Sequence, residues 1–161
     1  MANKELTQML NTLRRSLPRP LQLHSTAKAA MSMSDEQIYA CSALACQLAE
    51  QGNMLDAKDL LVGLSTIDPE NAFVHSCLAA LYMRMEEKDL AAGEFLYTLQ
   101  LNPQDIAATT NLAELYFENG DLEKAKKYLD QAILLDETGE NPFASRAKAL
   151  KELLINLEEG K

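Results

Sequence analysis

The side chains that could carry out chemistry are few: three cysteines and two histidines. Cys46, His75 and Cys77 are the set that could bind zinc, because thiolates and imidazoles are ligands that zinc prefers. Their spacing matches no metal-binding motif, and an odd number of cysteines does not indicate a disulfide framework. We therefore expect no metal site, and interpret Cys41, Cys46 and Cys77 as small buried or groove-lining residues of a reducing compartment.

Motifs for catalysis are also missing from the sequence. It contains no phosphate-binding glycine loop, no His-Glu-x-x-His and no Cys-x-x-Cys. The adjacent acids Glu86 and Glu87 lie in a predicted turn, which is typical of a solvated charge cluster. We predict that the protein is not an enzyme and uses no cofactor, so that its function resides in a binding surface.

Charge is distributed unevenly along the 161 residues, whose net charge is −9. Residues 1–33 carry five basic side chains and one acidic side chain, whereas the rest of the chain holds 10 basic and 23 acidic ones. An acidic body repels phosphate backbones, so we expect no nucleic-acid partner. The apolar runs are far shorter than the ~18 residues that a membrane span needs, and no secretory leader opens the chain. We expect a cytoplasmic protein that does not insert into membranes.

The elements that must position any binding surface recur at a fixed interval of 34 residues. The recurring residues are Leu112-Ala113, Tyr116 and Ala125, then Leu78-Ala79, Tyr82 and Ala91, then Leu44-Ala45, Leu48 and Ala57. Small residues let two antiparallel helices approach, and the large residues beside them fill the remaining space. One such hairpin cannot bury its own apolar face, so neighbouring copies are expected to stack.

The three copies span residues 38–71, 72–105 and 106–139, so Ile38, Ala72 and Ile106 each occupy position 1 of a repeat. Positions 4, 7, 8 and 11 are expected to face the core. A capping box at Ser34 and Gln37 marks the start of the array. Gly52 and Gly120 lie at the predicted helix–helix turns, whereas the turn of the second repeat has to form without glycine.

Both ends of the array are predicted to be helical. Asn141-Pro142 is a helix start, followed by a capping helix over 142–158. Residues 1–33 are expected to form a helix-and-linker arm, and residues 34–161 the repeat domain.

The arm contains an amphipathic helix over residues 4–17, which Pro18-Arg19-Pro20 ends. Its apolar stripe must be buried against the repeats, a second subunit or a partner, unless the arm is mobile. The composition of the arm also has a faint similarity to a mitochondrial transit peptide, which Glu5 interrupts. We predict that the stripe mediates homodimer contact through Leu6, Met9, Leu10 and Leu13.

The pattern Leu112-Ala113-x-x-Tyr116, Gly120, Ala125, Leu129, Ala132 is similar to the tetratricopeptide consensus. The layout of arm, three repeats and final helix also resembles the class II chaperones of bacterial type III secretion. This resemblance implies an all-α fold: a right-handed superhelix of three tetratricopeptide repeats, with an N-terminal amphipathic helix and a C-terminal capping helix. It also implies a cytoplasmic chaperone that holds hydrophobic translocator subunits before their export.

In such arrays the first helix of each repeat lines the concave side. The resemblance therefore implies a groove for an extended apolar peptide, with small residues beside aromatic walls and with Asn111 and Glu114 bonded to the peptide backbone. The predicted peptide-binding residues are Tyr39, Ser42, Cys46, Ala49, Phe73, Ser76, Cys77, Ala80, Met83, Thr110, Asn111, Glu114 and Phe117. No Lys or Arg occupies these positions, so an acidic peptide tail is not the expected ligand. The alternative is a general scaffold that joins two folded proteins through its convex face.

Overall fold

The computed structural model describes residue 28 and residues 31–159. This part of the chain contains seven helices and no strand. The helices are α3 (Asp35–Glu50), α4 (Met54–Ile67), α5 (Ala72–Arg84), α6 (Lys88–Leu101), α7 (Ile106–Glu118), α8 (Leu122–Leu135) and α9 (Pro142–Glu159). The predicted all-α fold is confirmed. None of the described helices combines the length and apolar character that crossing a bilayer requires.

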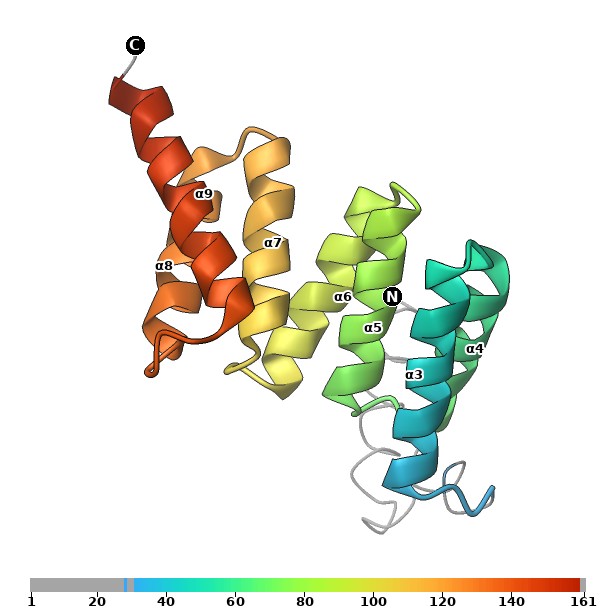
Figure 1. Cartoon of the computed structure of the whole chain (residues 1–161). Helices are drawn as coiled ribbons and strands as arrows, with labels where there is room; N and C mark the ends of the chain where they lie inside the picture. The colour runs from blue at the N-terminus through green and yellow to red at the C-terminus, as the bar shows by residue number, and fades with distance from the viewer. Residues whose placement is uncertain (1–27, 29–30, 160–161) are drawn as a thin grey trace, which may run out of the picture.

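The helices pair into three hairpins, α3/α4, α5/α6 and α7/α8, which stack one after another (Figure 1). Helix α9 packs against α7 and α8 at the end of the stack opposite α3. Each first helix begins at a polar N-cap side chain. Ser34 and Gln37 form the predicted capping box, and Asn71 and Asp105 accept hydrogen bonds from backbone N–H groups three residues ahead.

The turn inside each hairpin requires one residue with left-handed backbone. Gly52 and Gly120 occupy this position with φ of +89° and +78°. In the second repeat the equivalent residue is Glu86, with φ of +61°. A side chain other than glycine adopts this conformation at a cost of about 1 kcal/mol, so the second turn keeps the geometry of the other two without the residue best suited to it.

The small residues predicted to allow close helix packing are all buried. Ala45, Ala79 and Ala113 lie at position 8, and Ala57, Ala91 and Ala125 lie at position 20. Each pair belongs to the same apolar cluster, so position 8 packs within its own hairpin. This part of the predicted core is confirmed.

Position 7 differs, and the prediction for the first repeat is wrong. Leu78 and Leu112 are 2% and 0% exposed, whereas Leu44 is 50% exposed. Leu78 packs into the cluster of the first repeat and Leu112 into that of the second. Position 7 therefore contacts the preceding hairpin, and among the described residues no hairpin precedes the first one.

The arm and its stripe Leu6, Met9, Leu10 and Leu13 lie outside the described residues, so the division into arm and repeat domain stays a prediction. Lys28 ties the end of the arm to the first hairpin: its Nζ lies 2.8 Å from Asp68 Oδ2 and also pairs with Asp35. The hydrogen bonds with Asp35 and Asp68 raise the pKa of Lys28. Burial alone would raise the pKa of Asp68, but the ammonium group prevails and the pKa is lowered.

Candidate functional site

Four of the predicted site residues line one small pocket between α3 and α5. Cys46 and Ala49 come from α3, and Cys77 and Ala80 from α5. The pocket has a volume of about 180 Å³, and its remaining walls are Ala45, Glu50, Leu61, Leu81 and Arg84. We call it the thiol pocket. It is mostly apolar, and a cavity of about 150 Å³ already accommodates a group the size of benzene.

A second hollow lies beside the predicted aromatic walls of the first two repeats. The rings of Tyr39 and Phe73 stack with centroids 4.7 Å apart, and the side chains are 60% and 40% exposed. Asp35, Glu36 and Asn71 complete the lining of a hollow of about 350 Å³. Two stacked rings left open to solvent offer a flat apolar shelf, which suits proline or aliphatic side chains.

The predicted polar positions of the third repeat have a partner from outside the repeats. Arg146 of α9 pairs through Nε with Glu114 Oε1 at 2.8 Å, and its Nη2 donates to Asn111 Oδ1. Burial raises the pKa of Glu114, and the adjacent guanidinium opposes this shift. A ligand backbone would have to share or replace these bonds, so the end of the groove next to α9 is polar and already ordered.

Two predicted site residues are inaccessible, and their assignment to the groove is wrong. Ser42 and Thr110 are 0% exposed. Ser42 Oγ donates to the Ile38 carbonyl at 2.9 Å, and Thr110 Oγ1 donates to the Phe143 carbonyl of α9 at 3.3 Å. Both residues are at position 5 of their repeats. Ser42 is buried between helices, and Thr110 is covered by α9.

Three further predicted residues are partly buried. Met83 packs against the apolar cluster around Phe95, and Phe117 packs against the cluster of the third repeat. Ser76 is also partly buried. These residues support the walls of the surface and expose only part of their side chains to a ligand.

The sequence reasoning missed two arginines at this surface. Arg84 lies at the edge of the thiol pocket and donates from Nη2 to the Ala49 carbonyl at 3.0 Å, and Arg146 reaches Asn111 and Glu114 from α9. The predicted groove positions themselves hold no Lys or Arg, but these two guanidinium groups reach the surface from other positions. Neither residue is at a groove position of a repeat, so no periodic pattern in the sequence could have identified them.

The histidine considered for a zinc site is engaged elsewhere. His75 is buried; its Nδ1 lies 2.6 Å from Glu94 Oε2 and its Nε2 lies 3.0 Å from the Pro69 carbonyl oxygen. Tyr97 donates to the same carbonyl at 3.1 Å and packs edge-on against the imidazole. Both ring nitrogens have oxygen partners, so His75 joins the first two repeats structurally.

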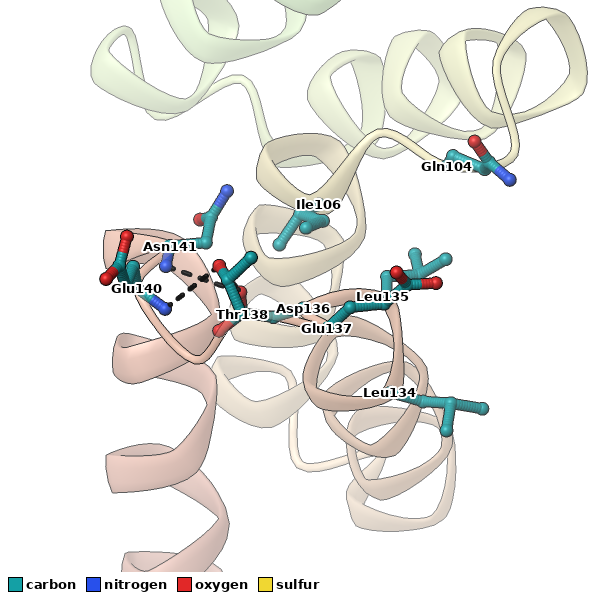
Figure 2. Close-up of a pocket in the computed structure, with 9 residues that line it drawn as sticks. All are labelled: Gln104, Ile106, Leu134, Leu135, Asp136, Glu137, Thr138, Glu140 and Asn141. Carbon is teal, nitrogen blue, oxygen red and sulfur yellow. Dashed lines mark hydrogen bonds between the residues drawn. The ribbon is translucent and has the colours of Figure 1, made fainter.

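A larger hollow of about 640 Å³ lies at the connection between α8 and α9 (Figure 2). Its loop is held by its own hydrogen bonds: Asp136 Oδ1 accepts from the backbone N–H groups of Gly139 at 3.1 Å and Asn141 at 3.4 Å. Leu134, on its rim, is 82% exposed. This loop replaces the proline-containing connection of the earlier repeats. Because its own hydrogen bonds hold it in place, we interpret the hollow as a feature of the turn into α9.

Comparison with known proteins agrees with this architecture. The family model described as Tetratricopeptide repeat matches residues 90–154. The Tetratricopeptide repeat protein 21 homolog of Caenorhabditis elegans is 35% identical over 66 residues, which are 41% of this chain. The match covers only 5% of the length of that curated relative.

Solved structures of known chaperone and peptide complexes have the same fold. The Yersinia enterocolitica type III secretion chaperone SycD, in complex with a peptide of the translocator YopD, superposes with a TM-score of 0.69 at 20% identity. That match covers 78% of this chain and 97% of the other. The first tetratricopeptide repeat domain of Spaghetti (RPAP3), bound to the HSP90 peptide SRMEEVD, gives 0.68 at 18% identity and covers 79% and 97%. The predicted tetratricopeptide-repeat fold and its likeness to translocator chaperones are confirmed.

Proposed function

We propose that this protein is a non-enzymatic chaperone that holds an extended apolar segment of a type III secretion translocator in the cytoplasm. The observation that carries the proposal is that α3 and α5 together form both the thiol pocket and the exposed Tyr39–Phe73 shelf. A chaperone of this fold in Yersinia enterocolitica has been solved with a translocator peptide, which supports the same class of partner here.

The two hollows suit different side chains of one extended segment. The thiol pocket is lined mainly by small apolar groups and has a volume of about 180 Å³, so it fits one aliphatic side chain. The aromatic shelf is open, so it fits a proline or a second aliphatic residue. Alternate side chains of an extended peptide point to the same side, which would let the segment contact both in turn.

Three features of the chain support a cytoplasmic, protein-binding role. Cys41, Cys46 and Cys77 are free thiols, as expected for a reducing compartment. The acidic body disfavours nucleic acid. The walls of the thiol pocket are mainly alanine, cysteine and leucine, which favours binding over chemistry.

A general scaffold is the second candidate, and exposed leucines on the second helices favour it. Leu55, Leu90 and Leu134 are 65%, 51% and 82% exposed on α4, α6 and α8. These side chains lie on the second helix of each hairpin and line neither the thiol pocket nor the Tyr39–Phe73 hollow, so they could contact a folded protein.

Removing the aromatic shelf tests the two functions against each other. In the Tyr39→Ala/Phe73→Ala variant, we expect binding of a co-expressed hydrophobic translocator to weaken at least about tenfold, because exposed aromatic anchors contribute more than about 1 kcal/mol each. Co-purification followed by titration calorimetry measures the effect. Both side chains are exposed, so the variant is expected to fold.

Leu55→Ala is the matched control because it removes an exposed apolar side chain from α4. The chaperone proposal requires Leu55→Ala to bind like the unmodified protein. If Leu55→Ala abolishes binding while the aromatic variant retains it, the scaffold is the correct function. If no hydrophobic translocator is bound or solubilised, the chaperone proposal is wrong.

We also propose that the stripe Leu6, Met9, Leu10 and Leu13 of one copy mediates dimer contact by covering the Leu44 face of a second copy. The basis is that Leu44 is half-exposed where its equivalents Leu78 and Leu112 are buried. Residues 4–17 carry an apolar stripe of matching helical spacing. The acidic α3 region and the basic arm are also complementary in charge.

Sedimentation equilibrium checks the dimer. We expect twice the monomer mass for the unmodified protein, and the monomer mass for Leu13→Glu and Leu44→Glu, because a charge cannot be buried unpaired at such an interface. Leu134→Glu, at a more exposed leucine, should remain dimeric. A monomeric unmodified protein, or dimeric Leu13→Glu and Leu44→Glu variants, would contradict the proposal.

A further inference from the structure

The thiol pocket contains two cysteines from different helices. Cys46 lies on α3 and Cys77 on α5, both partly buried and both free thiols. The residues around them on the two helices are small: Ala45, Ala49 and Ala80. Alanine at a helix–helix contact allows the two backbones to approach closely, and both cysteine side chains line the same small cavity.

The electrostatic environment indicates that the two thiols interact. Burial raises the pKa of Cys77, and the proximity of Cys46 raises it further. Cys77 therefore stays a protonated thiol at neutral pH. A raised pKa makes the Cys77 thiol the poorer nucleophile towards an oxidant, so the first attack is assigned to Cys46.

We propose that Cys46 and Cys77 are a modification site at which a peroxide forms a reversible intramolecular disulfide across the groove. The Cys46 thiolate attacks one peroxide oxygen; an S–O bond forms, the O–O bond breaks and, after protonation, the first water leaves. The Cys77 thiol gives up its proton as its sulfur attacks the Cys46 sulfenic acid, and the S–S bond forms as the S–O bond breaks. The Cys77 proton leaves with the hydroxide as a second water. Two electrons from the two thiols thus reduce one peroxide, and a thiol reductant reverses the reaction by exchange.

The third cysteine is a control supplied by the chain itself. Cys41 also lies on α3, but it does not line the thiol pocket. It is five residues before Cys46, so the two side chains point about 140° apart around the helix. Cys41 packs against the apolar cluster of the first repeat. Oxidation is therefore expected to spare it while Cys46 and Cys77 react.

The disulfide would change the binding surface, a consequence that rests on the proposed function. An S–S bond of about 2.05 Å draws the two sulfur atoms together across the pocket and fills the space that an aliphatic side chain would enter. It would also join α3 to α5 covalently. The oxidised protein is therefore expected to bind an apolar segment at least about tenfold more weakly, a loss of about 1.4 kcal/mol.

The experiment treats the full chain with hydrogen peroxide and follows the intact mass and the non-reducing peptide map. We expect a loss of about 2 Da, reversed by a thiol reductant, and a cross-linked peptide containing Cys46 and Cys77. Cys41→Ser should give the same result, whereas Cys46→Ser and Cys77→Ser should form no intramolecular cross-link. A cross-link through Cys41, disulfides only between molecules, or oxygen addition without a cross-link would each overturn the site.

The mass measurement does not depend on any peptide ligand. If the cross-link forms but no translocator segment binds the reduced protein, the proposed function fails and the modification site stands. If a segment binds equally well before and after the cross-link forms, the site is real but does not control the groove. Circular dichroism before and after oxidation checks that the helices remain intact.

Discussion

Phe95→Ala is expected to lower the free energy of unfolding by about 3–5 kcal/mol, the range for removing a fully buried phenylalanine. Phe95 is 0% exposed on α6 and is the largest fully buried side chain among the described residues. Its cluster includes Ala79 of α5 and Ala108 and Leu112 of α7. Truncation would leave a cavity where the second and third repeats meet, and a stack of repeats depends on each such interface.

Urea denaturation followed by circular dichroism measures this change, with Leu134→Ala as the control. Leu134 is 82% exposed, so removing its side chain should change the free energy of unfolding by less than about 0.5 kcal/mol. A repeat array can lose cooperativity, so the shape of the transition should be compared as well as its midpoint. Equal losses in the two variants would mean that Phe95 does not lie in the core.

Ala113→Leu is expected to cost about 1–3 kcal/mol through overpacking. Ala113 is 0% exposed in the cluster of the third repeat, which also contains Ala125 and Leu129 of α8 and Ala147 of α9. The added carbons have to separate α7 from α8 or α9, because no space is left between three helices in contact. The midpoint of thermal unfolding should fall accordingly.

Ala149→Leu is the matched control because Ala149 is exposed on α9 and the substitution is the same. Alanine and leucine have similar helix propensities, so the control should unfold close to the unmodified protein. An unfolding midpoint for Ala113→Leu equal to that of the unmodified protein would show that α7 and α8 do not approach at this residue.

The fold could be predicted from the sequence because its information is local and repeated. Alanines at positions 8 and 20 recur three times, and every one of the six is buried. The turn conformation also recurs in all three repeats: Glu86 adopts the left-handed backbone that glycine adopts in the other two. A packing constraint that recurs in every copy selects the same residue type at the same position of each repeat. This 34-residue periodicity is what predicts the hairpins.

The site could be predicted only in part, because it depends on the neighbours at each end of the stack. No described hairpin precedes the first one, and α9 covers part of the third. Leu44 carries the same residue type and position as Leu78, yet it is exposed because no described hairpin precedes it. Thr110 occupies a predicted groove position, yet α9 covers it. The same repeat position therefore has different surroundings in different copies.

The sequence by itself determined that this chain is a stack of three tetratricopeptide hairpins, since helix period, turn residues and small core residues are properties of neighbouring residues along the chain. Only the tertiary structure decided which side chains remain for a ligand. It brought Cys46 to Cys77 in one pocket and Arg146 to Glu114 across α7 and α9. Contacts between helices depend on how the hairpins pack against one another. The residue type at one position therefore does not tell which side chain of another helix will contact it.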